Sequence, residues 1–171
     1  LYGDSIDAFD QLDKSLKPLD MLPMLREDES VHQLYVFEGR LEPKPRRWVV
    51  NLILLVLTFI SVLYVGTLSA VNELASTNRF EAIAVYNNIW ENLWRGLPYA
   101  ISIMLILGAH ELGHYFAARR HKIAVTLPYF IPFPFGIFGT FGAFIQLREP
   151  MRNRRTLFDI GAAGPLAGLV F

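Results

Sequence analysis

The chain has 171 residues, of which 53% are hydrophobic and 19% are charged, and its mean hydropathy is +0.31. Its 16 basic residues balance its 16 acidic residues, so the formal net charge is zero and we expect no nucleic-acid partner. This composition excludes an ordinary soluble domain, and the absence of cysteine excludes disulfides and thiolate metal sites.

Residues 1–47 are predicted to form a soluble N-terminal segment. Four apolar residues recur in it at helical spacing, and four aspartates form the opposite stripe of the same helix. These residues are Ile6, Phe9, Leu12 and Leu16, and Asp4, Asp7, Asp10 and Asp13. The aspartates could instead bind a cation, but solvated faces of amphipathic helices commonly carry such charges. A short strand is predicted at 31–37, and Pro43 and Pro45 interrupt regular structure after it.

Two later segments are long and apolar enough to cross a bilayer, which takes about 20 residues of helix. The first is 48–71, which contains no charged residue, and the second is 97–118. Between them, 72–96 is polar and is predicted to be an outer loop. Trp90 and Trp94 are spaced one helical turn apart in this loop, which suits an interfacial helix or an aromatic belt.

Residues 119–156 are predicted to form a re-entrant segment on the inner side of the membrane. The uncharged stretch 123–147 would pass for a third span, but prolines and glycines argue against a regular helix. These are Pro128, Pro132, Pro134, Gly136, Gly139 and Gly142. Basic residues flank the stretch on both sides, so a crossing would place one cluster outside, against the positive-inside tendency. After the turn, 143–147 is predicted to be a strand.

A third membrane helix is predicted to start near Leu157. From there to Phe171 a helix would be about 22 Å long, whereas the hydrocarbon core is about 30 Å thick. The basic cluster Lys44, Arg46 and Arg47 then lies on the same side as the later clusters. We therefore predict a mainly α, polytopic membrane protein with a short re-entrant β-containing segment, in a fragment that ends inside a transmembrane helix.

The segment His110-Glu111-Leu112-Gly113-His114 lies in the second predicted span and has the pattern His-Glu-x-x-His. On a helix, histidines at i and i+4 share one face, so both can bind one zinc ion. Glu111 follows the first ligand and can act as the base toward a water that the metal activates. A structural role, with Glu111 paired to Arg119 or to a later helix, is the alternative. Ionisable residues inside an apolar span favour the functional reading.

A catalytic zinc needs a third protein ligand. Asp159 is the nearest candidate, because it lies close to the start of an apolar helix. An acid there also stabilises a helix N-terminus without binding any metal. Glu149 and His121 lie among basic residues and are weaker candidates.

The ordered motifs resemble the site-2 protease family of intramembrane zinc metalloproteases, especially its cyanobacterial and plastid branch. The resemblance covers roughly 97–171 and rests on the histidine motif and on two glycine-rich segments. These segments are Phe138-Gly139-Thr140-Phe141-Gly142-Ala143 and Gly161-Ala162-Ala163-Gly164-Pro165. The resemblance implies that His110, His114 and an aspartate of a later helix hold the zinc. That aspartate usually precedes glycine, and the chain has no Asp-Gly pair. The third ligand is therefore expected beyond Phe171, and the fragment alone is expected to be inactive.

The resemblance also implies a substrate, namely a transmembrane helix of another protein that is cut within or near the bilayer. Because a helix hides its peptide bonds, we hypothesise that the predicted strand binds the unwound substrate by β-augmentation. Phe144, Ile145 and Gln146 would then contact the substrate.

The predicted function is regulated intramembrane proteolysis in a bacterial plasma membrane or a thylakoid or plastid membrane. The N-terminus and the opening of the active site would face the cytoplasm or stroma. One alternative is a catalytically inactive scaffold or chaperone of the same family, against which the intact Glu111 argues. Another is a transporter with a broken helix at 123–147, which does not explain the paired histidines.

Overall fold

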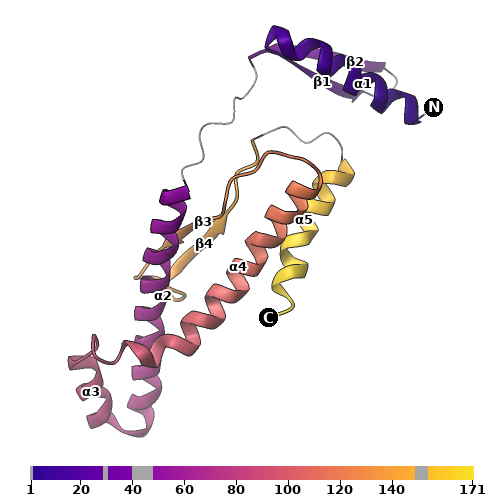
Figure 1. Ribbon diagram of the computed structural model, residues 1–171. Coiled ribbons are helices and arrows are strands. Elements are labelled where there is room, and N and C mark those ends of the chain that lie inside the picture. Colours follow the sequence, from indigo (N-terminus) through magenta and orange to yellow (C-terminus); the bar gives the residue numbers. More distant parts are fainter. Residues whose placement is uncertain (1, 29–30, 40–47, 149–153) are drawn as a thin grey trace. The chain divides into compact units, whose positions relative to one another are not determined.

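A computed structural model describes residues 2–28, 31–39, 48–148 and 154–171, and the chain divides into two units, 1–44 and 45–171. In the first unit, helix α1 (Tyr2–Leu16) and the short 3-10 helix η1 (Lys17–Leu19) precede a β-hairpin (Figure 1). Strands β1 (Met21–Asp28) and β2 (Val31–Glu38) pair antiparallel. The helix and the second strand lie where the sequence predicts them, whereas β1 lacks a clear alternation of apolar residues.

The second unit begins with helix α2 (Trp48–Thr77), which continues past the predicted end at residue 71. Its 30 residues are about 45 Å long, which exceeds the thickness of a hydrocarbon core of about 30 Å. The predicted span ended at residue 71 because the residues after it are polar. A membrane helix can nevertheless continue beyond the apolar layer, as α2 does. Among the described residues, α2 and the helix ending at Arg120 are the two that are long and apolar enough to cross a membrane.

The connection after α2 contains helix α3 (Arg79–Asn87) and the 3-10 helix η2 (Leu93–Gly96). Asn78 caps α3, because its side-chain oxygen accepts a hydrogen bond from the backbone N–H of Glu81 at 3.3 Å. The two tryptophans do not share a helix, contrary to one form of the prediction. Trp90 lies in a turn and stacks on Tyr64 of α2, and Trp94 lies in η2.

Helix α4 (Leu97–Arg120) carries the histidine motif, and helix α5 (Arg154–Gly168) runs antiparallel along it (Figure 1). Small residues bring the two helices close together. A side chain at Gly113 of α4 would overlap the backbone carbonyl of Ala163 in α5. Helix α5 starts before the predicted position near Leu157, because the polar residues of its first turn are helical as well.

Strands β3 (Tyr129–Pro132) and β4 (Thr140–Phe144) form an antiparallel hairpin that lies between α2 and α4 (Figure 1). Two polar side chains of α2 hold it. Asn51 donates hydrogen bonds to the carbonyls of Leu127 and Pro128 at 3.0 and 2.9 Å. Ser61, about 15 Å further along the helix axis, donates to the Gly139 carbonyl at 2.6 Å. The hairpin therefore enters along α2, turns, and returns toward the end at which it began.

The strand predicted at 143–147 has different bounds, because β4 ends at Phe144. Pro128 would continue the ladder opposite Ile145, but proline has no N–H to donate. Pairing resumes further along as an isolated bridge between Val125 and Leu147, with the register shifted by one residue. The chain from 143 to 147 is thus extended but paired only in part.

Candidate metal centre

His110 and His114 lie one turn apart on α4, and their Nε2 atoms are 3.1 Å from each other. A tetrahedral zinc ion with Zn–N bonds of about 2.0–2.1 Å separates two ligand nitrogens by about 3.3 Å. The two rings are therefore spaced and directed as a shared metal ion requires, with an adjustment of a few tenths of an ångström.

Helix α5 orients the second histidine. The Nδ1 atom of His114 lies 2.7 Å from the backbone carbonyl oxygen of Ile160. Because a carbonyl oxygen only accepts hydrogen bonds, the hydrogen lies on Nδ1, and Nε2 of the neutral ring keeps a free lone pair. This contact prepares His114 to bind a metal through Nε2. Sequence reasoning could not name this acceptor, since any residue can supply a backbone carbonyl.

Glu111 is buried in α4, with 6% of its surface exposed, and its carboxylate faces the backbone N–H of Ile145. One residue along a helix turns the side chain by about 100°, so Glu111 points toward the hairpin rather than along the histidine face. The alternative partner Arg119 is exposed at the end of α4. The burial of Glu111 beside both histidines suits a base that serves a water held between them.

The glycines of α5 differ in what they contact. A side chain at Gly164 would overlap the imidazole ring of His114. At Gly168 a Cβ would lie 3.5 Å from the Cβ of His110, which is ordinary van der Waals contact. Gly161 has nothing within 4 Å of the position a Cβ would take. Of the three glycines, Gly164 is therefore the position that makes room for a candidate ligand.

The candidates for a third ligand do not join the two histidines in the described part of the chain. Asp159 and His121 instead contact each other, with 3.2 Å between Oδ2 and Nε2. Glu149 lies outside the described residues. No group of three or more metal-ligating side chains is present among the residues that the structure describes. The expectation that the third ligand lies beyond Phe171 stays a prediction.

The three predicted substrate-binding residues present different groups. Phe144 ends β4 and stacks on Tyr129 of β3. The backbone N–H and C=O of Gln146 both bond to Thr126, at 3.0 Å each. Because backbone groups alternate in direction along an extended chain, those of Ile145 point to the opposite edge, which agrees with its N–H facing Glu111. Ile145 thus brings the outward edge of the extended chain next to the candidate base, with its N–H directed at the Glu111 carboxylate.

Residues 98–171 match peptidase family M50. This segment belongs to the family, which is that of the site-2 proteases. Over 142 residues the chain is 32% identical to the "Probable zinc metalloprotease EGY1, chloroplastic" of Oryza sativa subsp. japonica. The alignment covers 74% of this chain and 24% of that protein. Identity with the EGY1 of Arabidopsis thaliana is 33% over 141 residues, covering 74% of this chain and 25% of the relative.

The chain is also 38% identical over 88 residues to the "Probable zinc metalloprotease EGY2, chloroplastic" of Arabidopsis thaliana. This alignment covers 52% of the chain and 15% of that relative. The chain therefore spans about a quarter or less of the length of the curated relatives it matches. No solved structure matches it.

Proposed function

We propose that this chain supplies part of the catalytic centre of an intramembrane zinc metalloendopeptidase, in which His110 and His114 bind the zinc and Glu111 is the catalytic base. The observation that carries the proposal is the 3.1 Å separation of the two Nε2 atoms on an apolar helix, with a buried glutamate beside them. The relatives named as zinc metalloproteases support it. The third ligand would come from a later segment of the full-length protein.

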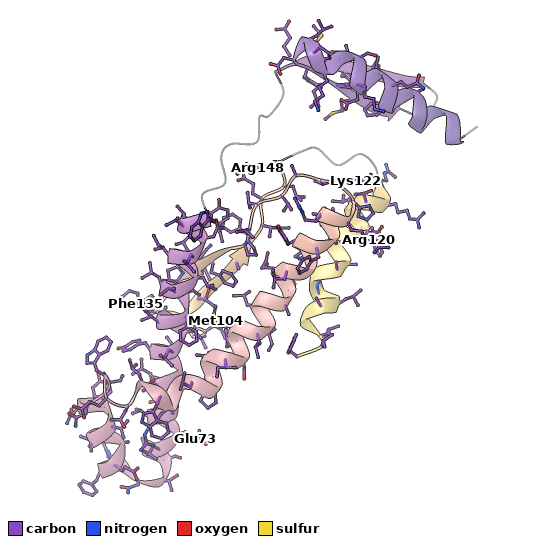
Figure 2. The ribbon with its side chains drawn as sticks, viewed as in Figure 1. Glu73, Met104, Arg120, Lys122, Phe135 and Arg148 are labelled. Carbon is purple, nitrogen blue, oxygen red and sulfur yellow. The ribbon has the colours of Figure 1, made fainter. Side chains whose placement is uncertain are left out.

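We propose further that α2 and α4 cross the membrane and that the β3–β4 hairpin is re-entrant. Figure 2 shows Arg120, Lys122 and Arg148 at one end of this unit and Glu73 at the other. The positive-inside tendency then places the basic end in the cytoplasm or stroma. Irregular backbone at membrane depth requires protein partners, and Asn51 and Ser61 supply them. The names of the chloroplastic relatives favour a plastid membrane.

Zinc, when bound, supplies Lewis-acid activation of water and of the scissile carbonyl. Glu111 takes a proton from the attacking water and passes it to the nitrogen of the leaving amine. The N–H of Ile145 would hold the carboxylate at the hairpin edge, where the substrate is proposed to dock. The Ile160 carbonyl holds His114 in the tautomer that binds through Nε2.

The substrate in this proposal is a transmembrane helix of another protein, which must unwind before its peptide bonds can be reached. The extended chain at 143–147 offers an edge for strand addition, and main-chain hydrogen bonds would hold any unwound sequence there. The edge at Ile145 lies beside Glu111, so a strand docked on it would pass the metal centre.

Replacing Ile145 with proline removes the N–H that faces Glu111 and disturbs main-chain pairing at this edge, and is expected to lower cleavage of a transmembrane substrate by at least about tenfold, with zinc retained. The matched control Ile145→Ala shortens the side chain but keeps the N–H, and should cleave at close to the wild-type rate. Both variants of the full-length protein would be measured in proteoliposomes, together with their zinc content. Equal loss of cleavage in both variants would assign the effect to the side chain and contradict strand addition.

Removal of the metal tests the proposed function as a whole. Full-length protein treated with a zinc chelator is expected to lose cleavage of the reconstituted substrate to background, and stoichiometric zinc should restore it. Magnesium serves as the control, because it prefers oxygen ligands and octahedral geometry. Cleavage that persists in metal-free protein would contradict a zinc peptidase.

A further inference from the structure

The C-terminal end of α4 borders an open depression of about 390 Å³ that the peptidase chemistry does not use. Arg119, Lys122, Ile123 and Ala124 line it. The backbone N–H of Arg148 bonds to the Ala124 carbonyl at 2.8 Å, which brings a third basic residue to its border. The depression thus combines two cationic residues with two apolar ones, Ile123 and Ala124.

Among the described residues, the two cationic side chains that line the depression, Arg119 and Lys122, have no acidic partner. The carboxylate of Asp159 instead contacts His121. Lys122 also has a φ of 58°, a left-handed conformation that glycine or asparagine adopts with less strain just after a helix. Lysine at this position therefore terminates the helix less favourably than glycine or asparagine would, but it adds a positive charge to the depression.

Below the cations, an apolar stripe continues along the same face of α4. Phe116 precedes Arg119 by three residues, and Leu112 lies one further turn into the helix. Their exposed fractions are 63% and 41%, so both side chains are open to the surroundings. The order is cation at the helix end and apolar surface toward the middle, which matches the order of headgroup and acyl chain in a lipid.

We propose that this depression binds an anionic phospholipid, with the phosphate of the headgroup at Arg119 and Lys122 and an acyl chain along Phe116 and Leu112. The site rests on the proposed placement of α4 across the membrane, with its basic end at the inner surface. Guanidinium and ammonium groups are the usual partners of phosphate, and basic residues next to a span attract anionic lipids.

The test is native mass spectrometry of the full-length protein in detergent, titrated with phosphatidylglycerol or phosphatidylcholine of identical acyl chains. We expect phosphatidylglycerol to bind at least about tenfold more tightly, and the double variant Arg119→Gln, Lys122→Gln to lose that preference. The matched control is the double variant Arg79→Gln, Arg95→Gln, which removes the same amount of charge at the opposite end of the unit. It should keep the preference for phosphatidylglycerol. The exchange Arg119→Lys, Lys122→Arg keeps both charges and should also bind, which separates a lost site from misfolding.

Equal binding of the two lipids, or an unchanged preference in the Gln double variant, would overturn the proposal. Glycerol phosphate is the third arm. If it displaces phosphatidylglycerol at similar concentrations, the depression recognises a free phosphate and the lipid assignment is wrong. Zinc content and cleavage are measured on the same samples, so a protein that binds lipid but no zinc would contradict the peptidase proposal and leave this one intact.

Discussion

Replacement of Glu111 with glutamine in the full-length protein is expected to reduce substrate cleavage by about 10²–10⁴-fold without loss of zinc. Glutamine keeps the size and one acceptor oxygen of glutamate, so it can still face the N–H of Ile145. It cannot accept the proton of the attacking water, and the general-base contribution is lost. Cleavage of a reconstituted transmembrane substrate and zinc per chain are the two measurements.

The matched control for this variant is Glu73→Gln, which removes an exposed carboxylate at the opposite end of the unit (Figure 2). It should cleave at the wild-type rate. If Glu111→Gln also cleaved normally, Glu111 would not be the base. If it lost cleavage but kept the biological effect of the protein, the scaffold alternative would be favoured over proteolysis.

The second large effect is expected from Gly164→Ala. The added methyl group would overlap the ring of His114, so the ring must leave its position or the helices α4 and α5 must separate. Overpacking of this kind typically costs about 1–3 kcal/mol, and here the displaced group is a proposed ligand. We expect zinc affinity to fall by about 10–100-fold, as when the support of a metal ligand is lost, and cleavage to fall with it.

Gly161→Ala is the matched control in the same helix, because nothing lies within 4 Å of the added atom. It should retain both zinc and activity. Zinc affinity from competition with a chromogenic chelator, together with helix content from circular dichroism, distinguishes loss of the ligand from loss of the fold. Normal zinc binding by Gly164→Ala would contradict the placement of α5 against His114.

The apolar helices and the histidine motif could be predicted because both are local patterns. Helical spacing puts His110 and His114 on one face whatever surrounds them. A turn followed by a strand could be predicted within 123–147, since Pro128 and the following glycines argue against a helix, whereas the partner strand β3 was not predicted. The register of the hairpin could not be predicted, because the bounds of β4 depend on which partner residue lacks an N–H.

The contacts that complete the candidate centre were not predictable. His114 is held by the backbone carbonyl of Ile160, and Glu111 faces the backbone N–H of Ile145. Backbone groups leave no signature in a sequence, and both contacts join segments that are distant along the chain. The glycine-rich segment from Gly161 to Pro165 was the available signal, but the sequence alone could not separate Gly164 from Gly161.

The central claim is that α4 holds a zinc ion through two histidines that α5 orients. Zinc per chain, measured by elemental analysis of the full-length protein, tests it most directly in the wild type, His114→Ala and Leu112→Ala. Leu112 belongs to the same motif but is exposed, so its loss should leave the centre unchanged. We predict about one zinc per chain in the wild type and in Leu112→Ala, and less than about a tenth of that in His114→Ala. Full zinc occupancy in His114→Ala would contradict the account.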